Sequence, residues 1–432
     1  MIQRDASRHL SGGTASSFVV ASMIGTGVFT SLGFQLVDIQ SVFPLIMLWI
    51  VGGIVALCGA LVYSELGTAF PRSGGEYNLL SRIIHPSIGF GAGIVSATVG
   101  FTAPAVLAAM ALGSYLSAVF QQLNPVIVAS IVILVSHVIH MNSIKWGTLF
   151  QESSTTVKIG LILIFIGFGY LVDTPQNISI LPKVGDGALL FSSGFAVSLV
   201  WVSYAYTGWN SVVYIAGEIR NPKMNIFRSM LIATAFVMVL YILLNYIFLS
   251  STPMDSMVGQ VEVGYIVGIH IFGENGANLI GLGISILLLS TVSSYVYIGP
   301  RIMQVMGEDH DFISFLKKKN EIGIPVNAFW VQLSLSFIFI LTSTFEQVLM
   351  YAGITLIITT TLTVISFFVL RVKEPGLNRP YQVWGYPFTP VIFIIVNFWI
   401  LFYSFKETTF ESIVGVAIIL FSILLYIFHE KK

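Results

Sequence analysis

Two glycines that bracket a threonine interrupt the first long apolar segment of this chain, in the order Gly25-Thr26-Gly27. A glycine in a helix interior costs about 1 kcal/mol relative to alanine, so a helix is easily broken there. If it unwinds, the backbone N–H groups of the following half-helix are freed, and such an end binds anions. The alternative is that these small residues let a second helix approach closely. The stretch alone leaves both interpretations open.

A second candidate break lies in the sixth apolar segment, at Ala205 and Gly208. As a continuous helix this segment, 188–217, would be about 45 Å long, too long for a straight crossing. The second break lies five spans after the first. Because this is an odd number of crossings, the two halves of the chain that begin with the breaks run in opposite directions across the membrane. Interrupted helices at matching positions of two halves indicate a transporter site near the membrane midplane. Freed N–H groups and freed carbonyls together suit a ligand with both charges, such as an amino acid.

A few charged residues in or beside the apolar segments are further candidates for functional residues. Lys158 lies inside the fifth segment, near its expected cytoplasmic start. Ionisable residues are costly in a membrane and mark functional sites by default. The alternative is a lysine whose flexible chain carries its ammonium to the interface. Glu65 and Glu76 are expected to pair with Arg72 or Arg82 rather than to move protons.

The elements that position these residues are apolar helices. The 432-residue chain is 56% hydrophobic and 9% charged, with a mean hydropathy of +0.89, whereas soluble domains are about 25% charged. The apolar runs reach about 20 residues or more, the length that crosses a bilayer as a helix. We predict an all-α polytopic membrane protein with twelve transmembrane helices. The predicted spans are 14–37, 43–67, 87–118, 124–141, 154–172, 188–217, 227–250, 275–305, 325–343, 347–371, 386–405 and 411–428.

The distribution of basic residues predicts the orientation. With twelve spans both termini lie on one side. If that side is the cytoplasm, seventeen of the twenty lysines and arginines fall in cytoplasmic loops and ends, and only Lys183 and Lys406 lie outside. Because orientation follows this asymmetry, we expect a multi-pass protein of the cell (inner or plasma) membrane with both termini cytoplasmic. The N-terminus lacks the apolar region of a signal peptide, so we expect no cleavage there.

Two loops are expected to hold short helices. Residues 71–77 predict a turn, followed by a short interfacial helix at 78–85 on the cytoplasmic side. Residues 253–274 mix apolar and polar side chains at near-helical spacing, which predicts an amphipathic helix over the extracellular mouth. It is either a lid or a passive interfacial helix. Pro104 is expected to kink the third span.

Several motifs, taken jointly, resemble the amino acid–polyamine–organocation transporter superfamily, and most closely its L-type amino acid transporter branch. They are Gly25-Thr26-Gly27-Val28-Phe29, Glu65-Leu66-Gly67 with residues 71–77, residues 204–209 with Glu218-Ile219-Arg220-Asn221-Pro222, residues 290–307 with Arg301, and Arg379-Pro380-Tyr381. The resemblance covers nearly the whole chain. It implies a five-plus-five inverted repeat with discontinuous helices 1 and 6, followed by two added helices. The implied divisions are a cytoplasmic tail (1–13), a first repeat (14–172), a second repeat (188–371), and the last two helices with a cytoplasmic C-terminus (386–432).

The resemblance also implies a binding site at the two breaks. Thr26 and Gly27 would offer N–H groups to the substrate carboxylate, and the amine would bind carbonyls around Ile24, Tyr204 and Thr207. Tyr204 takes the place of the aromatic residue that closes over the substrate. The implied substrate-binding residues are Ile24, Gly25, Thr26, Gly27, Tyr204, Ala205, Thr207 and Gly208. We expect Gly27→Val to abolish binding while the protein stays folded.

Lys158 matches a lysine of the L-type branch, within Thr156-Val157-Lys158. The resemblance implies that its ammonium acts like a built-in sodium ion, which argues for sodium-independent transport. Its implied partners are a carbonyl at or near Gly25 and the hydroxyls of Ser290, Ser293 or Ser294.

These observations favour a secondary transporter for amino acids, neutral ones in particular, working as an exchanger or facilitator. The alternatives are a proton-coupled symporter of amino acids or amines and, from another class, an amino-acid-gated sensor or channel. An enzyme is disfavoured, since no nucleophile–base pair or metal triad is present. The expected partners are an amino acid and the lipid bilayer, with no nucleic acid, cofactor or metal. Cys58 is the lone cysteine and the loop 117–124 has none, so we expect no disulfide-linked heavy chain, and a monomer or weak homodimer.

Overall fold

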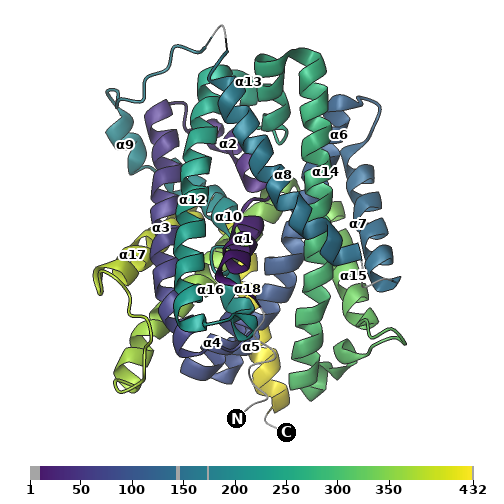
Figure 1. Cartoon of the computed structure of the whole chain (residues 1–432), viewed down its shortest axis with the longest axis vertical. Coiled ribbons are helices and arrows are strands. Elements are labelled where there is room, and N and C mark those ends of the chain that lie inside the picture. The colour runs from purple at the N-terminus through teal and green to yellow at the C-terminus, as the bar shows by residue number, and fades with distance from the viewer. Residues whose placement is uncertain (1–9, 143–145, 173–174, 431–432) are drawn as a thin grey trace.

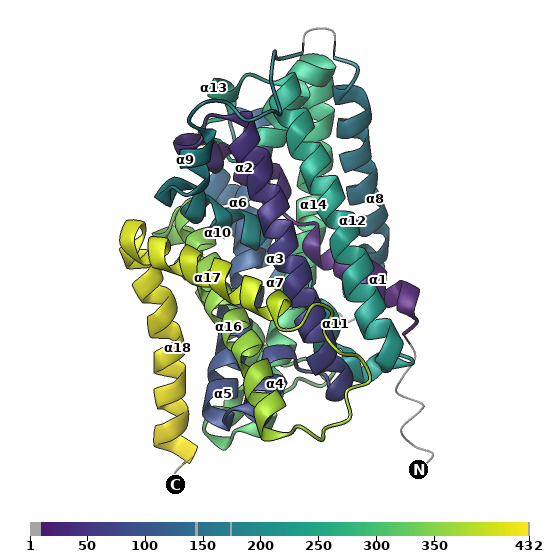
Figure 2. The ribbon, with the colours of Figure 1, turned by 90° about the vertical axis from the view of Figure 1, so that its left-hand side faces the viewer.

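The computed structural model describes residues 10–142, 146–172 and 175–430. Within these ranges the regular elements are helices, and Figures 1 and 2 show them packed into one elongated bundle. Nine helical stretches of the described residues are long and apolar enough to cross a membrane. They are Gly12–Asp38, Val42–Ala69, Pro86–Val119, Pro125–Asn142, Pro222–Ser251, Val263–Asp309, Phe345–Lys373, Phe388–Glu407 and Thr409–His429. The chain is therefore an all-helical, polytopic membrane protein.

The predicted first and sixth spans are both interrupted. The first consists of α1 (Gly12–Met23) and α2 (Gly27–Asp38). The sixth consists of α10 (Ser193–Tyr206) and the short α11 (Ser211–Tyr214). Two short elements flank it, α9 (Asp186–Leu190) and the 3-10 turn η2 (Ala216–Glu218). The helical part of the sixth span is thus shorter than the 188–217 segment predicted from its apolar run.

Most other spans are continuous helices whose ends lie within a few residues of the predicted ones. They are α3 (Val42–Ala69), α7 (Pro125–Asn142), α8 (Trp146–Gly169), α12 (Pro222–Ser251), α15 (Val326–Thr342), α16 (Phe345–Lys373), α17 (Phe388–Glu407) and α18 (Thr409–Glu430). The exception is α8, which begins at Trp146 rather than at 154. Figure 2 shows α1 and α17 strongly inclined to the long axis of the bundle, whereas α8 and α18 run along it.

The third span contains a wide turn where the sequence predicted a kink. It runs as α5 (Pro86–Val95), the π-helical turn η1 (Ser96–Thr102) and α6 (Ala103–Val119). Pro104 has no N–H to donate to the preceding turn. The hydroxyl of Thr102 donates instead to the carbonyl of Ala97, five residues earlier, at 2.9 Å. The proline is therefore accommodated by a wider turn just before it.

Short helices lie at both ends of the bundle, as predicted for the two structured loops. Gly273, at φ 71° and ψ 175°, divides the long α14 (Val263–Asp309), and the part before it belongs with α13 (Met254–Met257) to the 253–274 segment. Figure 1 places α13 at the upper end, the expected extracellular side. The helix α4 (Gly75–Ile83) lies at the lower end, and the turn η3 (Asp311–Lys317) follows α14.

Candidate functional site

The first break frees the start of α2. Ile24 leaves the helix at φ −78° and ψ 91°, while its N–H still donates to the carbonyl of Val20 at 3.0 Å. The N–H of Phe29 donates to the carbonyl of Thr26 at 3.0 Å, which closes the first turn of α2. The leading N–H groups of a helix have no acceptor within it, and no acidic residue lies in this turn. The start of α2 therefore offers donors to an anion.

The second break frees the end of α10. Gly208 has φ 102°, a left-handed conformation that residues with side chains rarely adopt. Thr207 is extended at ψ 147°, and its hydroxyl donates to the carbonyl of Tyr204 at 2.7 Å. The last carbonyls of a helix lack intrahelical donors, and the dipole makes this end negative. The end of α10 therefore suits a cationic group.

The two breaks pack directly against each other. A Cβ atom built on Gly27 would lie 2.6 Å from the Cα of Ala205 in α10. A Cβ atom on Gly208 would lie 2.6 Å from the carbonyl carbon of Ser22 in α1. Both glycines therefore permit close approach of backbones, the role that small residues play between membrane helices. Gly27→Val would disturb this contact, contrary to the expectation that the protein stays folded.

Gly25 differs from Gly27, because it borders open space. No atom lies within 4 Å of a Cβ atom built on it, and the residue is half-buried. The neighbouring Thr26 is buried, and its side chain interacts with that of Tyr204 from α10. Gly25 thus has free space at its Cβ position, next to a residue that contacts the second break. The packing interpretation of the motif therefore applies to Gly27, which lies against α10. The binding-site interpretation applies to Gly25, which borders free space.

Lys158 is held inside the bundle. Its side chain is buried, and its Nζ donates to the Oγ1 of Thr291 in α14 at 3.0 Å. An amine buried in this way does not reach the membrane interface, so burial argues against the snorkelling alternative. The hydrogen bond ties α8 to α14, and α8 also contacts α1.

Two of the three hydroxyls predicted as partners of Lys158, those of Ser293 and Ser294, contact other groups. Ser293 Oγ lies 2.8 Å from His140 Nε2, and Ser294 Oγ donates to the carbonyl of Ser290 at 3.0 Å. The partner that the structure does give, Thr291, was not named from the sequence. It belongs to the same stretch of α14, where four of the five residues 290–294 carry hydroxyls and made the choice ambiguous.

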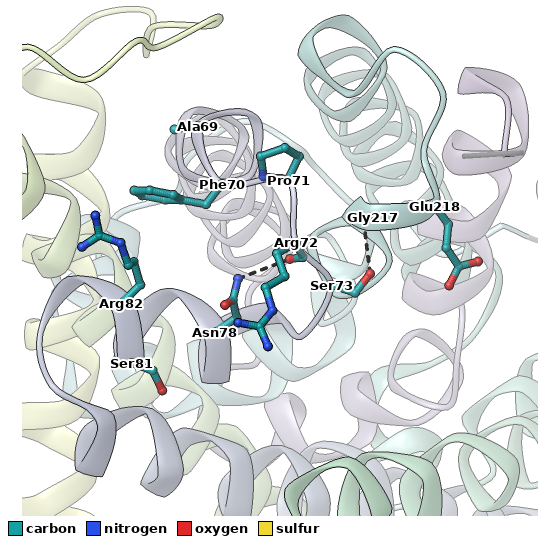
Figure 3. Close-up of a pocket in the computed structure, with 10 residues that line it drawn as sticks. All are labelled: Ala69, Phe70, Pro71, Arg72, Ser73, Asn78, Ser81, Arg82, Gly217 and Glu218. Carbon is teal, nitrogen blue, oxygen red and sulfur yellow. Dashed lines mark hydrogen bonds between the residues drawn. The ribbon is translucent and has the colours of Figure 1, made fainter. Parts of the chain in front are cut away.

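A cleft of about 950 Å³ opens at the expected cytoplasmic end. Figure 3 shows the α3–α4 loop and α4 facing the segment that carries Gly217 and Glu218. The backbone N–H of Gly217 donates to Ser73 Oγ at 3.1 Å across this cleft. Its lining residues are Ala69, Phe70, Pro71, Arg72, Ser73, Asn78, Ser81, Arg82, Gly217 and Glu218. The cleft thus joins the motif of residues 71–77 to the end of the broken sixth span.

Glu65 does not pair with Arg72 or Arg82, as the sequence predicted. Its carboxylate lies 2.7 Å from Nη2 of Arg371 and 3.2 Å from Nε of Arg379, and it accepts the N–H of Val383 at 2.8 Å. Arg82 instead pairs with Glu374 at 2.9 Å. These partners lie some 300 positions away in the chain, beyond the reach of arguments from sequence proximity. Glu65 therefore fixes the end of α16 and the following loop to α3.

Among the described residues, all hydrogen-bond partners of the Glu76 carboxylate are neutral side chains. Its Oε1 accepts from the Tyr63 hydroxyl at 3.0 Å and from the Asn210 side chain at 2.6 Å, and its Oε2 accepts from the Tyr214 hydroxyl. Asn210 belongs to the second break and Tyr214 to α11. This buried carboxylate therefore links α4 to the broken sixth span, and the predicted pairing with an arginine is wrong.

The upper end of α2 is tightly covered. The N–H of Gly259, between α13 and α14, donates to the carbonyl of Gly33 at 2.8 Å. Tyr115 of α6 accepts from the N–H of Gly264 and donates to the carbonyl of Phe29, both at 2.9 Å. The predicted amphipathic segment therefore bonds directly to the half-helix that follows the first break.

Tyr241 is the most central residue that sequence analysis missed. Its hydroxyl, in the middle of α12, donates to the carbonyl of Met23 at 2.7 Å and lies 3.3 Å from that of Ala205. The sequence signal is slight: tyrosines of membrane helices concentrate at the interfaces, and this one lies at mid-span.

The model of one known protein family, described as "Amino acid permease", matches residues 10–428. The chain belongs to this family. It is thus a member of the amino acid–polyamine–organocation superfamily, whose members are membrane transporters and not enzymes. A match of this length includes both breaks, the buried lysine and the cleft at the lower end of the bundle.

Relatives of this permease include bacterial and mammalian transporters. It is 27% identical to the serine/threonine exchanger SteT of Bacillus subtilis (strain 168), over 90% of this chain and 89% of that protein. It is 26% identical to the mouse b(0,+)-type amino acid transporter 1, over 94% and 85%. It is 24% identical to the human large neutral amino acids transporter small subunit 2, over 96% and 78%. These similarities support amino acid transport, including exchange.

Proposed function

We propose that this permease exchanges neutral amino acids across the cell membrane by alternating access, without sodium. The observation that carries the proposal is the meeting of two broken helices beside Gly25. The donor end of α2 and the acceptor end of α10 lie at these two breaks, which pack against each other through Gly27 and Gly208. An amino acid presents one carboxylate and one ammonium a few ångströms apart, which matches both ends at once.

The proposed substrate contacts follow from these ends. The N–H groups of Thr26 and Gly27, with the Thr26 hydroxyl, bind the carboxylate. The carbonyls near Ile24, Tyr204 and Thr207 bind the ammonium, with Ala205 and Gly208 bordering the second break. The ring of Tyr204 closes over the substrate, since it already contacts Thr26 across the gap.

Twelve crossings in a five-plus-five arrangement are part of the proposal. Nine crossings correspond to the long apolar stretches, α8 and α15 carry shorter apolar helices, and α10 with α11 makes the remaining one. Spans one to five and six to ten then form inverted repeats that each begin with a broken helix. Both termini lie in the cytoplasm, and the protein acts as a monomer or weak homodimer without a disulfide-linked heavy chain.

Alternating access is supported by the difference between the two ends of the bundle. The upper end of α2 is bonded to the 253–274 segment through Gly33 and Tyr115, whereas the lower end carries a wide cleft. This arrangement corresponds to a carrier closed to the outside and open to the cytoplasm. In this proposal the segment acts as a lid.

Sodium independence and neutral specificity rest on two further observations. The ammonium of Lys158 supplies a fixed positive charge between α8 and α14, where a bound cation would otherwise be needed. The relatives include a serine/threonine exchanger and a large neutral amino acids transporter subunit, which favours neutral substrates.

Proton coupling is the second candidate, because one observation favours it. Glu76 is a buried carboxylate without a cationic partner among the described residues, and it touches both Asn210 and Tyr214. A proton on this carboxylate would force one of its three donors to turn away.

Uptake into proteoliposomes separates the candidates. We expect wild-type protein to take up labelled L-serine or L-leucine at the same rate in sodium and in choline buffer, and with or without an inward proton gradient. Labelled L-lysine should not be taken up. An uptake that needs sodium would contradict the role of Lys158, and a several-fold stimulation by the proton gradient would favour the symporter.

A further inference from the structure

A second, smaller cavity lies beside the break in the sixth span. Its volume is about 40 Å³, and its walls come from α3, α10 with the residues that follow it, α16 and α17. These helices pack against one another, and Figure 2 shows α17 lying across α3 and α16. The first span approaches the second break elsewhere, since α2 lies against Ala205 and α1 against Gly208. The cavity is therefore on a different side of the second break from α1 and α2.

The side chain of Asn397, in the middle of α17, lines this cavity. Residues 390–402 of the helix are otherwise apolar or aromatic. Asn397 is only 2% exposed, and no described residue forms a hydrogen bond with its side chain. An amide has two N–H donors and one acceptor oxygen, and burying it without partners is costly, above all in a membrane interior. The amide therefore calls for a ligand that the surrounding helices do not supply.

Other polar groups border the same cavity. The indole N–H of Trp209 is buried there, and it has no acceptor among the residues that the structure describes. The Thr207 hydroxyl donates within the break, and the Thr360 hydroxyl donates to the carbonyl of Leu356 at 2.8 Å. Both hydroxyl oxygens remain able to accept. Cavities lined by apolar groups alone stay dry, whereas this one offers both donors and acceptors.

We propose that the cavity is a hydration site, in which Asn397 holds a small cluster of water molecules against the second break. A buried water needs about 10–15 Å³ of such volume and about three hydrogen bonds, so the cavity has room for roughly three waters. The amide of Asn397 and the indole of Trp209 donate to the waters, which donate in turn to the oxygens of the two threonines. The cluster thereby bridges α17 to the irregular backbone that follows α10.

Hydroxyl-radical labelling read by mass spectrometry tests the proposal with water itself as the probe. X-ray irradiation converts bound water to hydroxyl radicals, which oxidise the side chains beside them. In substrate-free protein we expect oxidation of Phe393, a residue of the cavity wall that is only 2% exposed. Phe165 is fully buried against Phe248 of α12 and should stay unlabelled. Labelling of Phe393 no higher than that of Phe165 would overturn the inference.

The substitution Asn397→Leu replaces the amide with an apolar group of similar size. It should lower the labelling of Phe393 several-fold, whereas Asn397→Ser, which keeps a hydroxyl, should retain it. The matched control Ser404→Ala removes a buried hydroxyl of the same helix that donates to the carbonyl of Ile400 at 2.8 Å, and it should label like wild type. Equal labelling in wild type and Asn397→Leu would contradict the role of the amide. If Asn397→Leu does not fold, the wild-type comparison of Phe393 with Phe165 still decides.

Labelling in the presence of L-serine separates this inference from the proposed function. The proposed substrate lies where α1 and α2 meet α10, so a saturating concentration of L-serine should leave Phe393 labelled. Loss of the labelling would place the amino acid in the cavity, which would overturn the hydration site and support amino acid binding. If wild-type protein binds no amino acid and the labelling still depends on Asn397, the proposed function fails and the hydration site stands.

Discussion

Replacing Gly25 with valine is expected to yield a folded protein that no longer binds amino acids. No atom lies within 4 Å of a Cβ atom at this position, so the new side chain meets no backbone. In the proposed site it fills space beside the backbone N–H groups that bind the substrate carboxylate. We expect affinity for L-serine and L-threonine to fall by more than roughly ten-fold, equivalent to about 1.4 kcal/mol. Thermal stabilisation of purified protein by each amino acid measures this directly.

Two other glycines serve as controls for Gly25→Val. Gly167 is exposed on α8 and also has no atom within 4 Å of an added Cβ, so Gly167→Val should bind like wild type. Gly27→Val should lower the melting temperature as well as binding, because overpacking against Ala205 costs about 1–3 kcal/mol. Unchanged binding by Gly25→Val would show that the substrate does not bind beside Gly25 at the first break.

Replacing Lys158 with methionine is expected to abolish most transport while the protein remains folded. Methionine has a similar length and is apolar enough for a membrane interior, but the substitution removes the ammonium that donates to Thr291. Hydrogen bonds to charged groups contribute about 1.5–3 kcal/mol, so we expect the uptake rate to fall by roughly ten-fold or more. Uptake of labelled L-serine into proteoliposomes, normalised to inserted protein, is the measurement.

The control for Lys158→Met is a lysine at the expected extracellular side. Lys406, in the last turn of α17, is exposed, and Lys406→Met should transport at the wild-type rate. Thr291→Val, which removes only the acceptor, should reduce uptake less than Lys158→Met does. If sodium restores transport to Lys158→Met, the ammonium stands in for a cation. Wild-type uptake by Lys158→Met would leave the residue a structural role only.

Much of the fold was predictable because each span carries its own signal. Apolar length located the helices, and the glycines at 25, 27 and 208 located both breaks. The wide turn η1 was not predicted, since a proline signals only that a hydrogen bond is lost and not how the helix adjusts. The shorter helical part of the sixth span was missed because apolar residues continue through irregular backbone.

The structure brings the predicted site residues of the two breaks together, and their role in substrate binding stays a prediction. Lys158 was singled out as an ionisable residue inside an apolar segment, whereas the roles of Thr26 and Tyr204 came from the resemblance to the transporter family. Long-range partners have no such signal in the sequence: Thr291 is one of several hydroxyls in α14, and the arginines that hold Glu65 lie at the end of the tenth span and after it. The different roles of Gly25 and Gly27 appear only when α10 is placed against α2.

Counterflow in proteoliposomes tests the central claim, amino acid exchange through this paired site, most directly. Vesicles that contain the wild-type permease and an excess of unlabelled L-serine should accumulate labelled L-serine transiently above equilibrium. Vesicles without internal amino acid, or with Gly25→Val in place of wild type, should not. Equal and monotonic uptake in loaded and empty wild-type vesicles would contradict exchange and indicate a channel, and binding without any uptake would indicate a sensor.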